Sequence, residues 1–339
     1  MSQPIFLPAG KLPNDLLAQL LSRYRTPQER IVLGPGVGRD AAVIEMGDRY
    51  LVAKTDPITF ASDEIGWYLV NVNANDIATT GAVPRWLLCS ALFPEGKTAL
   101  DDVERVFRQL CEACLPLGIT LCGGHTEISS SVKQTVLVGQ MLGELQPEAL
   151  VTPEGLREGD AILLTKGIAI EGTALIAREL GWQLEGLLPP DVLERATGFL
   201  RDPGISVVGD ARIAASAARL HAMHDPTEGG LATALYELAE ASGLALEIDA
   251  SKVRVLPETE LLCRHYGLDP WGTIASGALL IGCASRDAPA VAEALERHGI
   301  WAAVIGRAWR GRGVWSRDEA GERQALPSFR RDEVARLFE

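Results

Sequence analysis

Apolar and polar positions recur with two different periods in the first half of this chain, and each period predicts its own kind of element. The runs AAVIE and YLVAKT are rich in β-forming residues and flank Gly47-Asp48, which predicts a β-hairpin. The segment from Ser62 to Thr80 is helix-like, with Ser62 as its expected cap. WLLCSAL predicts a strand, and the strongly periodic segment from Thr98 to Leu117 predicts a helix with one apolar face. There, Thr98 and Asp101 have nearly the spacing of a capping box.

The second half repeats this alternation of strand-like and helix-like segments. Strands are predicted for AILLTKG, LALEID, GALLIGCAS and WAAVIGRA, and helices for EGTALIAREL, ISVVGDARIAASAARL and the region around VAEALERHG. HAMHDPTEGGLATALYELAEASG predicts a short strand, a loop and a long helix. The turn-rich segment VTPEGLREGD separates the two halves. We therefore expect an α+β protein of two domains, covering residues 1–150 and 151–339.

Composition agrees with two packed domains. The chain has 339 residues, of which 47% are hydrophobic, and this is enough apolar material for two cores. No stretch approaches the roughly 18 apolar residues of a membrane span, and the first residues lack the pattern of a secretory signal. Six scattered cysteines do not form a disulfide framework. We expect a cytoplasmic protein that does not contact membranes.

The charge balance narrows the class of ligand. Lys and Arg total 32 against 45 Asp and Glu, so the net charge is −13. This is the wrong sign for a protein that follows a nucleic-acid backbone, and we expect no nucleic-acid partner. An acidic protein can still bind a small polyphosphate when carboxylates hold Mg²⁺ and the ion faces the phosphates.

A glycine-rich segment after IVL looks at first like a dinucleotide-binding motif. Gly36, Gly38 and Ala41 have the required spacing, and Asp56 follows at a suitable distance. That motif needs a helix directly after the glycines, because the helix N-terminus meets the pyrophosphate. The residues that follow alternate and turn at Gly47-Asp48 instead, so we reject a Rossmann dehydrogenase.

Acidic residues in the first half offer a better account. Asp40 ends the glycine-rich loop, Asp56 ends the run YLVAKT, Asp76 lies in a polar stretch of the helix, and Glu127 follows Gly123-Gly124. Each acid taken singly is typical of a cap or a turn. Together, from separate elements, they could hold two Mg²⁺ ions whose shells are completed by phosphates and water.

A second candidate site lies at the start of the long helix of the second half. The sequence from His224 to Leu231 reads HDPTEGGL, and its glycines would expose backbone N–H groups at a helix N-terminus. Such a turn binds anions, reinforced by the helix dipole. The alternative is a simple capped helix, with Asp225 or Thr227 as the cap.

Six motifs in this order resemble those of a known family: GPGVGRDAAV, KTD, NANDIATTGAVP, GGHTE, HDPTEGGLATALYELAEASG and ASGALLI. The sequence is similar to the ATP-binding superfamily of AIR synthase-related proteins, which contains PurM, thiamine-monophosphate kinase, selenophosphate synthetase and HypE. The resemblance covers about residues 30 to 310. It implies a PurM-like fold in which the N-terminal mixed sheet forms a β-barrel across a homodimer and the C-terminal domain is α/β, with ATP and Mg²⁺ between the domains.

The resemblance also implies roles for residues. The metal-holding residues would be Asp40, Asp56, Asp76 and Glu127, and the catalytic ones Asp76 and His125. His125 would be a proton shuttle or a phosphate donor, and a purely structural role is the alternative. The nucleotide-binding residues would be Gly38, Asn75, Gly123, Gly124, Thr126, Asp225, Thr227, Gly229 and Gly230. Arg39 stands where the family usually has Asp, which removes one metal ligand or substitutes a phosphate contact.

The segment HDPTEGGLATALYELAEAS looks most like HypE, although HypE usually has Arg where this chain has Glu228. HypE presents a C-terminal cysteine, whereas the last cysteine here is Cys283. We therefore expect a HypE-like Mg²⁺-ATP-dependent enzyme that transfers phosphate to a carbonyl-type oxygen or another acceptor, either a small molecule or a group carried by a protein. The alternatives are a kinase of the thiamine-monophosphate type and an ATP-binding regulatory or scaffold protein with weak catalysis.

Overall fold

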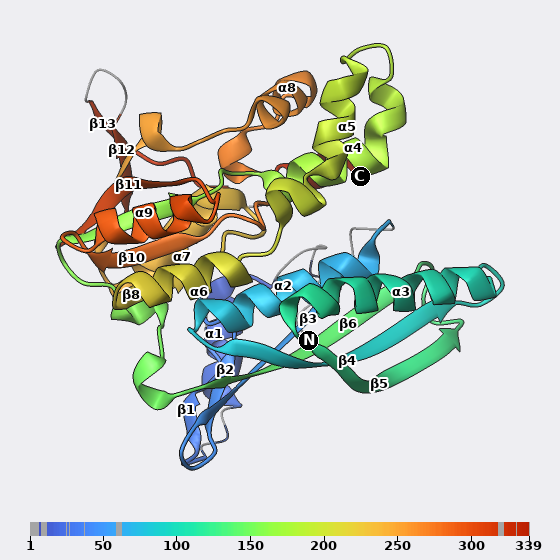
Figure 1. The fold of residues 1–339 in the computed structure, drawn as a ribbon, viewed down its shortest axis with the longest axis horizontal. Helices are drawn as coiled ribbons and strands as arrows, with labels where there is room; N and C mark the ends of the chain where they lie inside the picture. The colour runs from blue at the N-terminus through green and yellow to red at the C-terminus, as the bar shows by residue number, and fades with distance from the viewer. Residues whose placement is uncertain are drawn as a thin grey trace, which may run out of the picture.

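The computed structural model describes residues 7, 12–24, 26, 28–36, 38–58, 63–317, 322–329 and 331–338. It contains two sheets with helices packed on them, in the PurM-like α+β arrangement that the resemblance implied (Figure 1). The residue boundary between the two domains stays a prediction. The expected helix cap Ser62 lies outside the described residues.

The first sheet has six strands in the order β1-β2-β3-β6-β4-β5. Its strands are β1 (Ile31–Leu33), β2 (Ala42–Glu45), β3 (Tyr50–Ile58), β4 (Val83–Pro94), β5 (Thr120–Ser129) and β6 (Val136–Leu145). The predicted hairpin is confirmed as β2 and β3, which pair antiparallel from Ala42 with Ala53 to Glu45 with Tyr50. Among the described residues, strand β5 pairs with β4 alone, in parallel, and nearly all of its residues are exposed, so it forms an open edge.

Two helices cover one face of this sheet, α2 (Ile65–Thr79) and α3 (Leu100–Leu117) (Figure 1). Helix α2 is buried almost all round because it also packs against the second domain. Glycine allows its close approach to β6, since a Cβ at Gly139 would lie only 2.6 Å from Nδ2 of Asn73. This contact brings the polar stretch of α2 directly above β3 and β6.

Helix ends differ slightly from the sequence prediction. Helix α2 begins at Ile65 with Glu64 at its N-cap, and α3 begins at Leu100 rather than Thr98. The carboxylate of Asp102 accepts a hydrogen bond from the Ala99 N–H (2.9 Å), so the cap lies one residue later than the predicted pair of Thr98 and Asp101. The shift arises because the Thr98 hydroxyl instead donates to the Pro94 carbonyl (2.8 Å).

The second sheet has seven strands in the order β13-β12-β9-β11-β7-β10-β8. They are β7 (Asp160–Thr165), β8 (Leu220–His224), β9 (Ala245–Asp249), β10 (Leu280–Ala284), β11 (Ala302–Trp309), β12 (Val314–Arg317) and β13 (Arg323–Ala325). Helix α7 (Gly230–Ser242) packs on one face, and α6 (Val208–Ala217) and α9 (Ala288–Arg297) on the other. Neither β12 nor β13 was predicted, because both are short and neither is an apolar run.

Three further helices form a separate group in the second domain (Figure 1): α4 (Ile170–Leu184), α5 (Pro190–Gly198) and α8 (Pro257–Tyr266). Only α4 was predicted from the sequence. Buried residues of this group and of α2 belong to one continuous apolar core. Helix α1 (Asn14–Arg23), also not predicted, precedes the first sheet. None of the helices in the described ranges is long and apolar enough to cross a membrane.

Polar contacts along α2 join the two domains. The Arg201 guanidinium lies 3.0 Å from Glu64 and 4.5 Å from the ring centroid of Trp67. Near the other end of the helix, both amide atoms of Asn75 are used: Nδ2 donates to the Ile205 carbonyl and Oδ1 accepts from the Val207 N–H, each at 2.8 Å. Asn75, in the polar stretch of α2, therefore helps to attach the second domain.

A buried acid at the start of α4 predicts how stability depends on pH. Burial raises the pKa of Glu171 to about 7, with the charges of Asp332 and Glu228 acting in the same direction. The folded state therefore holds this proton more tightly than the unfolded state, whose pKa is near 4.5. The stabilisation is complete below pH 4.5 and is lost as the pH rises to 7.

We expect Glu171→Gln to remove this loss. At pH 8 the variant should exceed the wild type in unfolding free energy by up to about 3 kcal/mol, and near pH 4.5 the two should be similar. Urea unfolding at both pH values measures the difference. The exposed Glu148→Gln is the control and should change little. A difference between wild type and Glu171→Gln that is equal at both pH values would contradict the prediction.

Candidate functional site

Strand β3 supplies a lysine and an aspartate to the junction of the two domains. Lys54 and Asp56 project from the same face of the strand because side chains alternate along it. Asn73 of α2 fixes the backbone here, since its Oδ1 accepts a hydrogen bond from the Asp56 N–H (3.0 Å). Nζ of Lys54 lies 3.2 Å from the Asp56 carboxylate, so the two form an ion pair.

Helix α2 places a second carboxylate on the same lysine. Nζ of Lys54 lies 3.0 Å from Oδ2 of Asp76, whose side chain is only 4% exposed. Burial raises the pKa of Asp76 well above its usual range, and Lys54 opposes this shift. Burial alone would lower the pKa of Lys54, but Asp76, Asp56 and Asp40 together raise it further than burial lowers it. Lys54 is therefore the cation around which these three acids gather.

The end of strand β8 contributes a histidine and an aspartate. The buried imidazole of His224 has its Nδ1 at 3.3 Å from Oδ2 of Asp40 and its Nε2 at 2.9 Å from Oε2 of Glu237. Burial lowers the pKa of His224, but its hydrogen bonds to Asp40 and Glu237 outweigh this and raise it well above the usual value. The neighbouring Asp225 is 1% exposed. Burial, together with Asp40, raises the pKa of Asp225 to about 7.

These contacts define an acid cluster of four carboxylates, Asp40, Asp56, Asp76 and Asp225, with Lys54 and His224 as its cations. Ligand atoms of Asp40, His224 and Asp225 all lie within 4.8 Å of one another. Within the described part of the chain, neither carboxylate oxygen of Asp225 has a hydrogen-bond partner, although both are buried. Unsatisfied buried oxygens are costly, and a divalent cation would satisfy them. The donor set of carboxylates from separate elements thus fits Mg²⁺.

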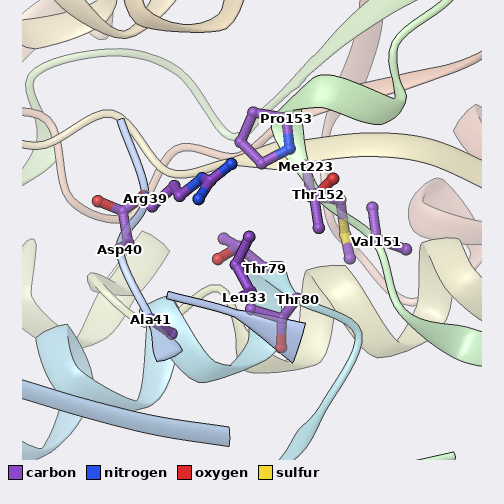
Figure 2. Close-up of a pocket in the computed structure, with 10 residues that line it drawn as sticks. All are labelled: Leu33, Arg39, Asp40, Ala41, Thr79, Thr80, Val151, Thr152, Pro153 and Met223. Atoms are coloured by element: carbon purple, nitrogen blue, oxygen red, sulfur yellow. The ribbon is translucent and has the colours of Figure 1, made fainter. Parts of the chain in front are cut away.

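The arginine of the glycine-rich loop points away from these acids. Nε of Arg39 donates to Oε1 of Glu154 at 2.9 Å, across to the segment that connects the domains. Figure 2 shows its side chain extending toward Pro153 while the Asp40 carboxylate points to the opposite side. The crevice that these residues line holds about 20 Å³, room for roughly one water molecule. The structure therefore gives Arg39 an ion pair that joins the domains.

The motif GGHTE lies elsewhere. Gly123 to Glu127 are part of the edge strand β5 and not of a loop, and β4 and β6 separate this strand from β3. His125 and Glu127 are exposed and contact each other, with Nε2 3.3 Å from Oε2. Within one chain, the sheet order places Glu127 at the far edge, away from the other three acids, and its role as a metal ligand stays a prediction.

The turn before α7 has the predicted backbone but already binds a carboxylate. Gly229 and Gly230 both have positive φ values, 79° and 64°, as an anion-binding turn with two glycines requires. However, the Gly229 N–H donates to Oδ2 of Asp332 at 2.7 Å, and the Gly230 N–H donates to the Thr227 carbonyl at 3.0 Å. A phosphate at this turn would have to replace the Asp332 carboxylate.

Four residues of the site were not predicted: Lys54, Asn73, His224 and Glu237. Lys54 could have been predicted from the sequence, because it stands two positions before Asp56 on a strand and therefore lies on the same face. His224 adjoins Asp225 in the second motif. Glu237 had no signal, since it lies 13 residues beyond His224, and only the packing of α7 against the sheet brings the two together.

Both halves of the chain match models of one known protein family. Residues 38–145 match the family described as AIR synthase related protein, N-terminal domain, and residues 157–315 match its C-terminal domain. The carbamoyl dehydratase HypE of Rhizobium leguminosarum bv. viciae is 30% identical over 280 residues, which are 79% of this chain and 76% of that protein.

Two solved structures share the fold. A chain in a structure described as a HypE–HypF complex has a TM-score of 0.76 and 20% identity, and the match covers 93% of this chain and 99% of that one. A structure described as hydrogenase maturation protein HypE in complex with ATP has a TM-score of 0.71 and 24% identity, covering 89% and 92%. Both likenesses support the two-domain architecture.

Proposed function

Since this chain belongs to the AIR synthase related protein family, we propose that it is a HypE-like enzyme that binds Mg²⁺-ATP and transfers the γ-phosphate to a carbonyl-type oxygen or another acceptor. The observation that supports this proposal most is the gathering of Asp40, Asp56 and Asp76 around one lysine at the domain junction. These three acids come from a loop, a strand and a helix that are distant in sequence. Such a convergence of like charges, one of them buried, is costly and is typical of a functional site.

In this proposal Asp40, Asp56 and Asp76 hold the metal. Asp225 joins them, because its buried oxygens have no hydrogen-bond partner within the described residues. A bound Mg²⁺ would neutralise charge that develops on the transferring phosphoryl group. Lys54 balances the acids in the metal-free protein and would move toward the phosphates once a metal takes its place. Gly38, with φ of 72°, gives the loop before Asp40 its turn.

The residues of β5 can belong to the proposed site only if a second copy of the chain packs against this strand. Gly123, Gly124, His125, Thr126 and Glu127 lie on the open edge of the first sheet, too far along the sheet to join Asp56 of the same chain. The homodimer that the resemblance implies would cover this edge. Their assignment to phosphate, metal and proton transfer therefore requires dimerisation, which the mass of the protein in solution tests.

The acceptor separates the proposed enzyme from its alternatives. Release of ADP that depends on a carbonyl-type or carbamoyl-type acceptor supports the HypE-like function, and release that depends on thiamine monophosphate supports the kinase. Tight ATP binding without turnover in the presence of either acceptor supports a regulatory or scaffold protein. A metabolite screen with ADP release as the readout decides among the three.

Nucleotide binding has a direct test of its own. Saturation with Mg²⁺-ATP at about one hundred times its dissociation constant should add about 2.7 kcal/mol to the unfolding free energy. ATP with EDTA should add much less, because the acid cluster repels a phosphate chain that carries no metal. Thermal unfolding with and without Mg²⁺ measures both values. Equal shifts under the two conditions would contradict binding through carboxylate-held metal.

A further inference from the structure

An imidazole nitrogen lies among the carboxylate oxygens of the acid cluster. Nδ1 of His224 is buried, and its ligand position lies within 4.8 Å of those of Asp40 and Asp225. We propose that His224 is itself a metal ligand, so that Asp40, His224 and Asp225 form a site that prefers a borderline transition-metal dication such as Zn²⁺ or Co²⁺ to Mg²⁺. This inference extends the metal site of the proposed function and can be tested without nucleotide.

The orientation of the imidazole supports the proposal. Nε2 of His224 lies 2.9 Å from Oε2 of Glu237 on helix α7, on the side of the ring opposite Asp40. In the metal-free protein Nδ1 faces the Asp40 carboxylate and holds a proton; a metal ion would displace that proton, while Glu237 continues to accept the Nε2–H. Metal-binding histidines are commonly held in this way by a carboxylate behind the ring, which sets both the tautomer and the ring direction.

Asp225 supplies the second, independent sign of a ligand. Both of its oxygens are buried, and neither has a hydrogen-bond partner in the part of the chain that the structure describes. A buried carboxylate normally accepts several hydrogen bonds, so a pair of unsatisfied oxygens beside an imidazole nitrogen points to a missing cation. Asp40 lies on the loop before β2, and its Oδ2 is 3.3 Å from Nδ1.

The chemistry of the donors decides the preferred ion. Mg²⁺ prefers oxygen ligands and keeps much of its bound water, so a fixed imidazole adds little to its binding free energy. Zn²⁺ and Co²⁺ bind imidazole nitrogen readily, and three protein ligands with open positions are typical of catalytic zinc sites. Asp56 and Asp76, which contact only Lys54 among the cations of the cluster, remain as an all-oxygen position suited to Mg²⁺.

Titration calorimetry of the metal-free protein with Co²⁺ and with Mg²⁺ tests the site. We expect wild type to bind Co²⁺ at least about tenfold more tightly than Mg²⁺. His224→Gln should weaken Co²⁺ binding by about 10-fold to 100-fold and leave Mg²⁺ binding within about threefold. Glu237→Gln, which keeps the ligand but loosens its orientation, should weaken Co²⁺ binding by about tenfold. His265→Gln, on exposed α8, is the matched control and should bind both ions as wild type does.

A second measurement does not require the His224 variant and so tests the proposal even if that variant does not fold. Proton NMR of Co²⁺-bound wild type should show a hyperfine-shifted, exchangeable imidazole N–H signal, and His265→Gln should retain it. Absence of that signal from Co²⁺-bound protein would overturn the proposal, as would unchanged Co²⁺ affinity in folded His224→Gln. Because no ATP is present, either result leaves the test of Mg²⁺-ATP binding unaffected.

Discussion

Lys54→Met is expected to lower the unfolding free energy of the metal-free protein by about 3–5 kcal/mol, because it leaves buried carboxylate charge without its cation. Nζ of Lys54 lies 3.0 Å from Asp76 and 3.2 Å from Asp56, and its side chain is only 13% exposed. Methionine fills a similar volume, so the loss of unfolding free energy is due to the missing charge rather than to altered packing. Urea unfolding at pH 7 in the presence of EDTA measures it.

The matched control is Lys252→Met, which removes an exposed ion pair with Asp249 (3.4 Å) and should cost at most about 1 kcal/mol. A divalent cation should partly rescue the Lys54 variant, since a metal can replace the charge that the lysine supplied. The gain in unfolding free energy on adding Mg²⁺ should therefore be larger for Lys54→Met than for wild type. Equal stability of the two lysine variants, or no gain with metal, would show that Lys54 does not balance the cluster.

Asp76→Asn is expected to weaken Mg²⁺-ATP binding by about 100-fold or more, because it removes a direct ligand of the proposed metal. At the ATP concentration that stabilises wild type by about 2.7 kcal/mol, the variant should gain only about 0.4 kcal/mol. Its metal-free stability should not fall in the same way, since burial already raises the pKa of Asp76 and makes its charge unfavourable. Thermal unfolding with and without Mg²⁺-ATP measures both quantities.

Asp101→Asn serves as the control for this variant. Asp101 is exposed in the first turn of α3, so its replacement should leave the nucleotide-dependent shift at the wild-type value. A full shift in Asp76→Asn would remove Asp76 from the proposed metal site. An absent shift in both variants would instead indicate that the protein does not bind Mg²⁺-ATP, and would count against the proposed function as a whole.

Local patterns predicted most of the elements near the site. The Gly47-Asp48 turn predicted the β2–β3 hairpin, and the apolar period predicted α2, α3, α4, α6, α7 and α9. Helix α3 is the clearest case, because it buries one face against α2 and β5. Helices α5 and α8 were missed, since they pack mainly on α4 and on each other, outside the layers that cover the sheets.

The candidate site was predicted in part. Asp40, Asp56 and Asp76 were named from the sequence, and the structure brings them together around Lys54. Asn75 was expected to bind nucleotide, yet its amide bonds the backbone of Ile205 and Val207. Side-chain type and spacing do not distinguish these uses, because an amide at a domain junction and an amide at a ligand look identical in sequence.

By itself, the sequence determined which residues carry charge and which elements present them, because strand alternation and helix period depend only on neighbours along the chain. The tertiary structure alone decided which of these charges meet. Sheet order moved Glu127 to an open edge, far from Asp56, and the packing of α7 brought Glu237 to His224. Both outcomes follow from contacts between segments distant in sequence, whose energies local spacing does not encode.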